Sequence, residues 1–298
     1  MGDFLGEIIK TDVVKLQEQL EKRLPSVALF QLADIPGVMR SRLGWPVAAS
    51  FMDRWFRSPK FEMSLDMKRG GASPYLLHQL PEERLEENLA TMTWALGFPR
   101  VRAAMLDLQM NWATARGLKL LRQRILKQGI GKTGCWRFGD LGRPAKEVDN
   151  SCQVNFAGVG KLSDPMDDFY AALGEASIKM AISGIVTSNT VSRVTIEVDE
   201  LGFYLRDTYD FNDDLFISQP LGFWSFNGVE RNARFANDVF TTPRFVHDRN
   251  VEEVRGRRYL VQNKHFRLWR EQHGRGGDFM VISDMHRIKL PKTIKYDF

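Results

Sequence analysis

Hydrophobic residues change their spacing along this chain at about residue 150. Before that point they recur three or four residues apart, as Leu16 and Leu20 do, which is the spacing of one helix face. After it they alternate with polar residues, as Val194, Ile196 and Val198 do, which is the pattern of a half-buried strand. The sequence therefore predicts an α+β fold, with a helical N-terminal part followed by a mixed or mainly antiparallel sheet domain with short helices.

Proline and glycine residues delimit the expected elements. Prolines stand in the first turn of several helical patterns, and glycines follow their ends. We expect helices over residues 11–24, 46–56, 81–97, 99–128, 164–173 and 263–273. We expect strands over residues 176–188, 191–200, 201–207, 221–226 and 278–284.

A segment rich in glycine and charged residues separates the two patterns. It runs over residues 131–150, and neither the helical nor the strand pattern continues through it. We therefore divide the chain into a helical region over residues 1–130, a linker over residues 131–150 and an α+β domain over residues 151–298.

Composition limits the class of protein. A chain of 298 residues with 43% hydrophobic residues is long and apolar enough to bury a core. The net charge of +5 mildly favours an anionic partner, but no run of four Lys or Arg residues occurs, so nucleic acid is not favoured. The two cysteines, Cys135 and Cys152, match no metal-ligand spacing and suit a reducing cytosol.

The sequence shows no secretory signal and no transmembrane segment. The first residues lack a basic head followed by a continuous apolar stretch, and nowhere do eighteen apolar residues follow one another. We expect a protein that is cytoplasmic in the producing cell and is exported, if at all, by a specialised route.

Acidic and aromatic residues gather in the segment LRDTYDFNDD over residues 205–214. Alternation along the preceding strand puts Asp207 and Tyr209 on one face and Asp210 at the rim. Two neighbouring carboxylates can hold Mg²⁺, or one can raise the pKa of the other and create a general acid or base. The alternative is a capped turn, because Asp and Asn side chains bond to their own backbone.

Two further segments carry candidate residues. Gly276 and Gly277 precede the expected strand that begins with Asp278, and glycine permits close approach of a ligand or of another stretch of backbone. The same glycines also suit the end of a helix. His286 and Arg287 follow that strand, and the expected helix over residues 263–273 carries His265 and Arg267. We take either histidine as the candidate base, and the two arginines beside them as further candidate site residues.

Several segments together resemble an uncharacterised family of proteobacterial proteins that is often encoded near type VI secretion and polymorphic-toxin genes. The segments that carry this resemblance are FQLADIPGVMRSRLGWPVAASFMDRWF, DFYAALGEASIKMAISG, GFYLRDTYDFNDD, QPLGFWS and FRLWREQHGRGGDF. The resemblance extends from about residue 30 to residue 284. It implies a cargo or accessory protein of that secretion machinery, with a secretion-apparatus protein or a cognate immunity or effector protein as its partner.

A shorter motif is similar to that of the colicin M family, whose members cleave an undecaprenyl-linked peptidoglycan precursor. Residues 207–210 match its Asp-x-Tyr-Asp motif, but Phe216 and Ile217 stand where that family has His-Arg. Met285–Arg287 offers such a pair on another strand. This similarity implies that Asp207 and Asp210 hold Mg²⁺ or orient a water, that a histidine moves the proton, and that an arginine stabilises the phosphate oxygens.

Two functions from different classes follow. The first is an antibacterial effector associated with type VI secretion, acting as a metal-dependent phosphoesterase on a cell-envelope precursor. The second is a non-enzymatic adaptor, chaperone or immunity-like protein that binds a secreted toxin through its many aromatic residues.

Overall fold

The structure is a computed structural model that describes residues 2–68, 77–190, 193–213, 218–231 and 245–298. The chain divides into two compact units. Unit 1 consists of Met1–Gly44 and Asn212–Leu268, and unit 2 consists of Trp45–Phe211 and Trp269–Phe298. The segment 131–150, which the sequence predicts to be a linker, lies within unit 2 and contains β3 (Gly134–Phe138) and α8 (Ala145–Ser151).

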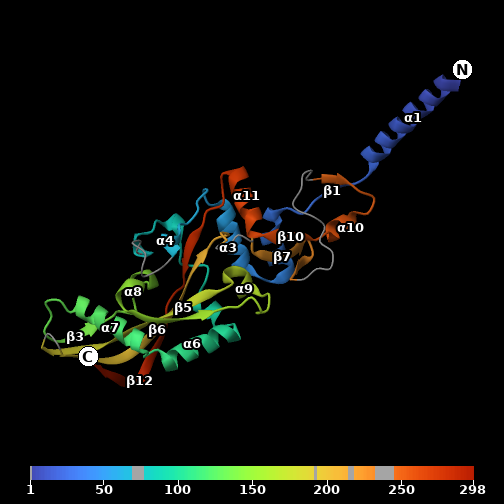
Figure 1. The fold of residues 1–298 in the computed structure, drawn as a ribbon. Helices are drawn as coiled ribbons and strands as arrows, with labels where there is room; N and C mark the ends of the chain where they lie inside the picture. The colour runs from blue at the N-terminus through green and yellow to red at the C-terminus, as the bar shows by residue number, and fades with distance from the viewer. Residues whose placement is uncertain (1, 69–76, 191–192, 214–217, 232–244) are drawn as a thin grey trace. The chain divides into compact units, whose positions relative to one another are not determined.

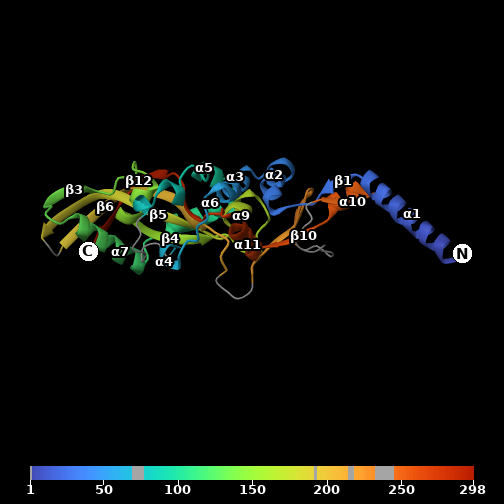
Figure 2. The ribbon, with the colours of Figure 1, turned by 90° about the horizontal axis from the view of Figure 1, so that it is seen from above.

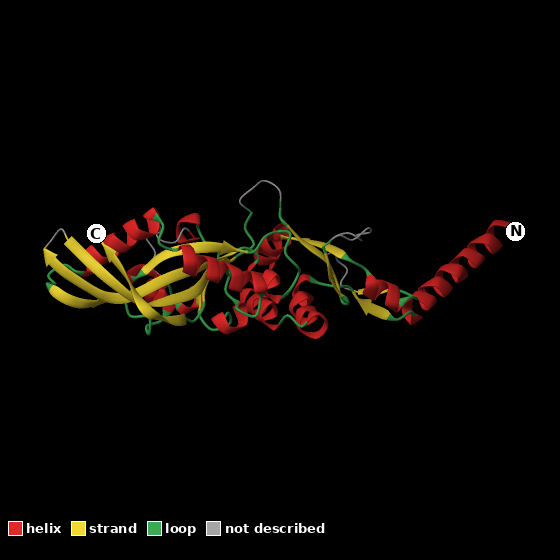
Figure 3. Ribbon diagram, turned by 90° about the horizontal axis from the view of Figure 1, so that it is seen from below, coloured by secondary structure: helices red, strands yellow, loops and turns green. Residues whose placement is uncertain are grey.

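The described part of unit 2 is organised around a mixed sheet of seven strands, which is strongly curled in Figure 3. Its centre is an antiparallel hairpin of β5 (Ala176–Thr190) and β6 (Arg193–Tyr209). The outer edge of β5 pairs with β3 and β4 (Gln153–Val159), and that of β6 pairs with β11 (Phe279–Ile282) and β12 (His286–Asp297). The short β2 (Leu85–Glu86) runs parallel to β11. The fold is α+β, as the sequence predicts.

Alternating side chains explain why β6 forms the middle of this sheet. Val194, Ile196 and Val198 are buried, whereas Glu197 between them is exposed. The pairing of β12 with β6 shifts register between Lys289 and Ile294, a stretch that contains Pro291. Proline has no N–H group to donate to a ladder, so its place at this irregularity is physically expected.

Helices cover the sheet of unit 2. α6 (Pro99–Asn111) and α7 (Ala115–Gln128) pack against β4, and α3 (Pro46–Arg57) packs against α9 (Asp168–Leu173), as can be followed in Figure 1. The short α4 (Leu65–Lys68), η4 (Leu77–Gln79), η5 (Glu82–Arg84) and α5 (Met92–Ala95) complete this unit. No helix in the described ranges has both the length and the apolar character needed to cross a membrane.

Two expected helices differ from the structure in kind, and a third, predicted over residues 164–173, begins only at Asp168, where the Asp167 side chain caps it. The predicted helix over residues 99–128 is two helices, because Trp112 is buried and the Thr114 hydroxyl accepts a hydrogen bond from the Gly117 N–H at 3.0 Å and starts α7. The predicted helix over residues 81–97 is instead η5, β2 and α5. There the buried Glu86 carboxylate pairs with Arg54 and accepts hydrogen bonds from the backbone of the following turn.

Unit 1 contains two small antiparallel sheets in its described part. β1 (Ser26–Ala28) pairs with β9 (Phe245–His247), and β7 (Pro220–Ser225) lies between β8 (Gly228–Glu230) and β10 (Tyr259–Gln262). The remaining elements are α1 (Gly2–Arg23), η1 (Leu32–Asp34), α2 (Ile35–Val38), η2 (Met39–Leu43) and α10 (Val251–Gly256). α11 (Asn263–His273) is divided between the units after Leu268.

The first helix carries an uncovered apolar stripe. α1 runs away from β1 and α10 in Figures 1 and 2, and its side chains Val13, Leu16 and Leu20 are 49%, 61% and 47% exposed. The spacing of these residues predicts the helix correctly. The spacing does not predict whether the stripe is buried, because an apolar stripe is buried only where another element lies against it.

A buried carboxylate joins four segments of unit 2. Asp278 is fully buried, and its carboxylate accepts hydrogen bonds from the Trp55 indole N–H at 3.0 Å, the Met63 backbone N–H at 3.0 Å and the Arg270 guanidinium at 3.1 Å. Burial raises the pKa of Asp278, and these three donors oppose that rise. We call these four residues the Asp278 hub.

The glycines before Asp278 permit close packing around the hub. Gly276 has a positive φ of 95°, and a Cβ there would lie 2.5 Å from the Trp55 ring. At Gly277 a Cβ would lie 2.4 Å from the Pro59 carbonyl oxygen. The close approach that the sequence predicts at these glycines is therefore made by the chain's own residues 55–59.

We expect Asp278→Ala to lower the free energy of unfolding by about 3–5 kcal/mol, because it leaves the buried Arg270 charge without its buried partner. Urea unfolding followed by tryptophan fluorescence measures this loss. Asp66→Ala is the control, since Asp66 is exposed, and it should stay within about 0.5 kcal/mol of the wild type. Equal stability of the two variants would contradict a central role of the hub.

We expect Gly276→Ala to destabilise the chain more than Gly274→Ala does. Both glycines have positive φ, so both substitutions incur the backbone strain of about 1–2 kcal/mol, but no atom lies within 4 Å of a Cβ at Gly274. The overlap with Trp55 should add about 1–3 kcal/mol at Gly276. Equal melting temperatures of the two variants would show that Trp55 moves away without loss.

Candidate functional site

The predicted aspartate cluster lies at the end of β6. The register with β11 places Asp207 opposite Val281 and Tyr209 opposite Phe279, so both side chains lie on the same sheet face. Asp210 follows the strand and forms an ion pair with Lys68, with 2.9 Å between Oδ2 and Nζ. The spacing of the aspartates does not indicate Lys68, which comes from the distant α4.

Tyr209 has the surroundings of a core residue. Its side chain is buried, and its ring stacks on Phe279 with 5.1 Å between ring centres and lies 5.5 Å from the rings of Phe51 and Phe211. Burial raises the pKa of the phenol, so the hydroxyl keeps its proton. The ring therefore contributes aromatic packing at this position.

Asp207 differs from a turn residue in its electrostatics. Its carboxyl group is partly buried, and its pKa is raised well above the ordinary value, first by burial and also by the Asp210 carboxylate. The hydrogen bond from the Thr208 backbone and the Lys68 charge oppose this rise. The two aspartates thus differ in their surroundings, because burial favours the neutral form of Asp207 whereas Asp210 contacts the Lys68 ammonium.

The remaining predicted residues of unit 2 lie elsewhere on the sheet. His286 pairs with Phe203, four residues before Asp207 on β6, which corresponds to about 13 Å along a strand. Arg287 binds the Glu200 carboxylate through two hydrogen bonds of 2.9 and 3.2 Å. The structure does not bring His286 and Arg287 to the aspartates, because residues 283–285 separate β11 from β12 and carry the chain along β6.

His265 and Arg267 belong to unit 1, at the start of α11. The His265 Nδ1 accepts a hydrogen bond from the Gln262 backbone N–H at 3.1 Å, and burial lowers the pKa of this imidazole. Arg267 forms an ion pair with Asp213 at 2.7 Å. Phe216 and Ile217, which stand at the His-Arg position of the colicin M motif, lie outside the described residues.

The aspartates do not fit a magnesium site well. Lys68 already supplies positive charge to Asp210, and the described residues contain no group of three or more His, Cys, Asp or Glu side chains that would surround a metal ion. Asp278 does not add a free ligand, because the hub donors occupy its carboxylate. We therefore derive no chemical step through a metal at this position.

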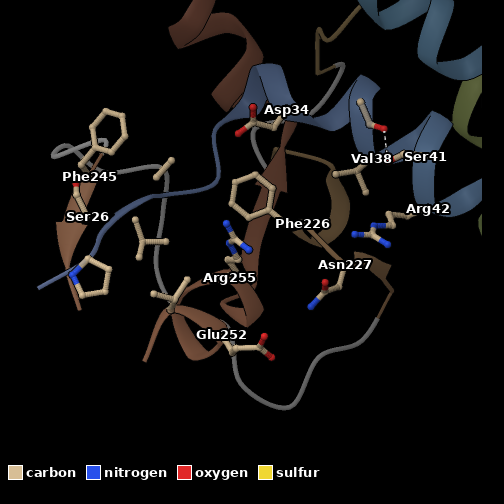
Figure 4. Close-up of a pocket in the computed structure, with 15 residues that line it drawn as sticks. Ser26, Asp34, Val38, Ser41, Arg42, Phe226, Asn227, Phe245, Glu252 and Arg255 are labelled. Atoms are coloured by element: carbon tan, nitrogen blue, oxygen red, sulfur yellow. Dashed lines mark hydrogen bonds between the residues drawn. The ribbon is translucent and has the colours of Figure 1, made fainter. Parts of the chain in front are cut away.

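A groove in unit 1 is a second candidate site, shown in Figure 4. It has a volume of about 1030 Å³ and is lined by β1, the segment from Asp34 to Arg42, Phe226 and Asn227, β9, and α10. Phe226 is held by an edge contact with the buried Phe30, with 5.2 Å between ring centres. The sequence does not indicate this site, because three segments far apart in the chain build it.

Positive charge and backbone groups face the groove. Figure 4 shows the guanidinium groups of Arg42 and Arg255 directed into it, whereas the Glu252 carboxylate lies at its lower edge. Neither arginine forms an ion pair with the residues that the structure describes. The Asp34 carboxylate is used locally, since it accepts a hydrogen bond from the Gln31 backbone N–H at 2.8 Å.

β1 has an edge available for pairing. The Asp248 N–H donates to the Pro25 carbonyl at 3.3 Å on the β9 side. Hydrogen bonds alternate along an antiparallel ladder, so the backbone groups of Ser26 and Ala28 point away from β9. Within the described residues β1 pairs with no second strand.

Comparison with known proteins gives one match. No curated protein and no solved structure is found to be similar to the chain. A family model with the description "Family of unknown function (DUF6402)" matches residues 30–298, which is most of the chain. The chain therefore belongs to the DUF6402 family.

Proposed function

We propose that this protein is a non-enzymatic binding protein that holds an extended, acidic peptide segment of a partner protein in the groove of unit 1. The observation that carries this proposal is a groove of about 1030 Å³ that is lined by two arginines and by β1. Among the described residues, neither arginine has an ion-pair partner and β1 pairs with β9 alone. A peptide that adds a strand to β1 gains main-chain hydrogen bonds, which provide affinity without a particular sequence.

The positive charges in the groove favour an acidic peptide as its ligand. An acidic side chain of the added strand would meet Arg42 or Arg255, and Phe226 offers a fixed aromatic surface beside them. Aromatic and arginine side chains contribute most strongly to protein interfaces. The resemblance to proteins encoded near type VI secretion and polymorphic-toxin genes supports a partner from that machinery, either an apparatus protein or a cognate effector or immunity protein.

We expect the full chain to select extended peptides rich in Asp and Glu from a phage-displayed library. The Arg42→Ala/Arg255→Ala variant should bind a selected peptide about tenfold more weakly, because two partly exposed ion pairs together contribute about 1.4 kcal/mol. Fluorescence polarisation with a labelled peptide measures this change.

The Arg116→Ala/Arg122→Ala variant is the matched control. Both residues are exposed on α7 in unit 2 and do not line the groove, so this variant removes the same net charge without changing the groove and should bind like the wild type. Selection of no peptide, or equal weakening in both double variants, would contradict a peptide site in the groove.

A second function is favoured by the unequal aspartates of unit 2. The raised pKa of Asp207 suits a general acid, and this residue lies beside the Asp210 carboxylate, whose partner, the Lys68 ammonium, is placed to interact with a developing negative charge. We propose hydrolysis of a phosphoester in a cell-envelope precursor as this second function, in line with the motif similar to colicin M. It would make the protein an antibacterial effector.

We expect the free energy of unfolding to depend on pH through the titration of Asp207. A raised pKa in the folded state means that the native protein binds the proton more tightly, so stability decreases as pH rises from about 4, the ordinary pKa of Asp, toward the folded pKa. Asp207→Asn keeps the neutral form and should remove this decrease, whereas Asp66→Asn at an exposed position should not. Chemical unfolding at several pH values measures the difference.

A double variant of the two aspartates tests the second function. A bacterium that expresses the wild-type chain in its periplasm should stop growing, and folded Asp207→Asn/Asp210→Asn should restore growth. Full toxicity of that folded variant would contradict catalysis by the aspartates.

A further inference from the structure

A cationic cluster on unit 2 is separate from the sites described above. Arg206 directly precedes Asp207 on β6, so its side chain lies on the opposite face of the sheet. On that face Lys179 of β5 lies between Tyr204 of β6 and Phe156 of β4, according to the strand registers.

One carboxylate organises the buried part of this cluster. Asp149 of α8 accepts a hydrogen bond from the Tyr204 hydroxyl at 2.6 Å and another from the Arg206 guanidinium at 2.5 Å. Arg124 of α7 donates to the Asp149 backbone carbonyl at 3.1 Å. Asp149, Tyr204 and Arg206 are all buried, so their positions are fixed by packing as well as by hydrogen bonds.

The cluster holds more positive than negative charge. Asp149 is the carboxylate that interacts electrostatically with all three cations, but its only ion pair among the described residues is with Arg206, so the charges of Lys179 and Arg124 are left unbalanced there. The Lys179 ammonium lies 4.2 Å from the centre of the Phe156 ring and forms no ion pair within the described part of the chain. Burial lowers the pKa of Lys179, and the nearby Arg206 lowers it further, against the effect of Asp149.

The residue after Asp149 carries an unpaired neutral donor. The Asn150 side-chain amide nitrogen is buried and has no hydrogen-bond partner among the described residues. It directly follows Asp149 in α8. Buried amide groups are ordinarily paired, so an unpaired donor one residue after Asp149 leaves a hydrogen bond that an acceptor from outside the chain could make.

We propose that Lys179, Arg206, Arg124 and the Asn150 amide form a binding site for the phosphate group of a phosphomonoester. A phosphomonoester carries between one and two negative charges at neutral pH and offers three acceptor oxygens. It would balance the excess charge of the cluster and accept the hydrogen bond of the amide. Phe156, which is 53% exposed, leaves an apolar surface beside the phosphate for the rest of the ligand.

Inorganic phosphate is the probe for this site. We expect phosphate to raise the melting temperature of the full chain relative to chloride at equal ionic strength, and to bind in a calorimetric titration. Lys179→Gln should weaken phosphate binding about tenfold, which corresponds to about 1.4 kcal/mol, whereas Lys179→Arg should retain it because the positive charge remains.

The variant Lys119→Gln distinguishes phosphate binding in the cluster from general attraction of phosphate to a positively charged protein. Lys119 is exposed on α7, so this variant removes the same charge near Arg124 but outside the cluster, and it should bind phosphate like the wild type. No stabilisation of the wild type by phosphate would overturn the proposal. Equal weakening in Lys119→Gln and Lys179→Gln would overturn it as well, since phosphate would then respond to net charge alone.

Discussion

The buried carboxylate of Asp278 is the interaction on which the arrangement of unit 2 depends most. Its oxygens bind donors from α3, from residue 63 and from α11, and Asp278 itself directly precedes β11. A buried charge is stable only if it is paired and hydrogen-bonded. The Asp278 carboxylate therefore holds all three donors in place. The consequence is a fixed start for β11, and hence a fixed register between β11 and the end of β6.

Much of the local structure could be predicted from the sequence. Pro46 in the first turn and an apolar face indicate α3, alternation from Val194 to Val198 indicates β6, and the helix over residues 263–273 has the expected bounds. The errors arise where a tertiary contact overrides a periodic pattern. Glu86 turns the segment 81–97 away from helix by pairing with Arg54, and the packing of buried Trp112 interrupts the pattern over 99–128.

The candidate sites were less predictable because they depend on which segments meet. Alternation indicates that Asp207 and Tyr209 share a face, but only the fold shows that aromatic rings surround Tyr209. Lys68 reaches Asp210 from a helix about 140 residues earlier in the chain. The groove of unit 1 and the cationic cluster of unit 2 have no motif at all, because each takes its charged residues from separated segments that are ordinary by themselves.

The division of the chain between the units also has a consequence for synthesis. Neither unit is a continuous stretch, since Asn212–Leu268 of unit 1 interrupts unit 2 before β11 and β12. Both strands pair with β6, so the outer edge of β6 has no partner while the intervening residues are being made. A ribosome adds about 5–20 residues per second, so the edge stays open for seconds and the nascent sheet depends on the last strands for closure.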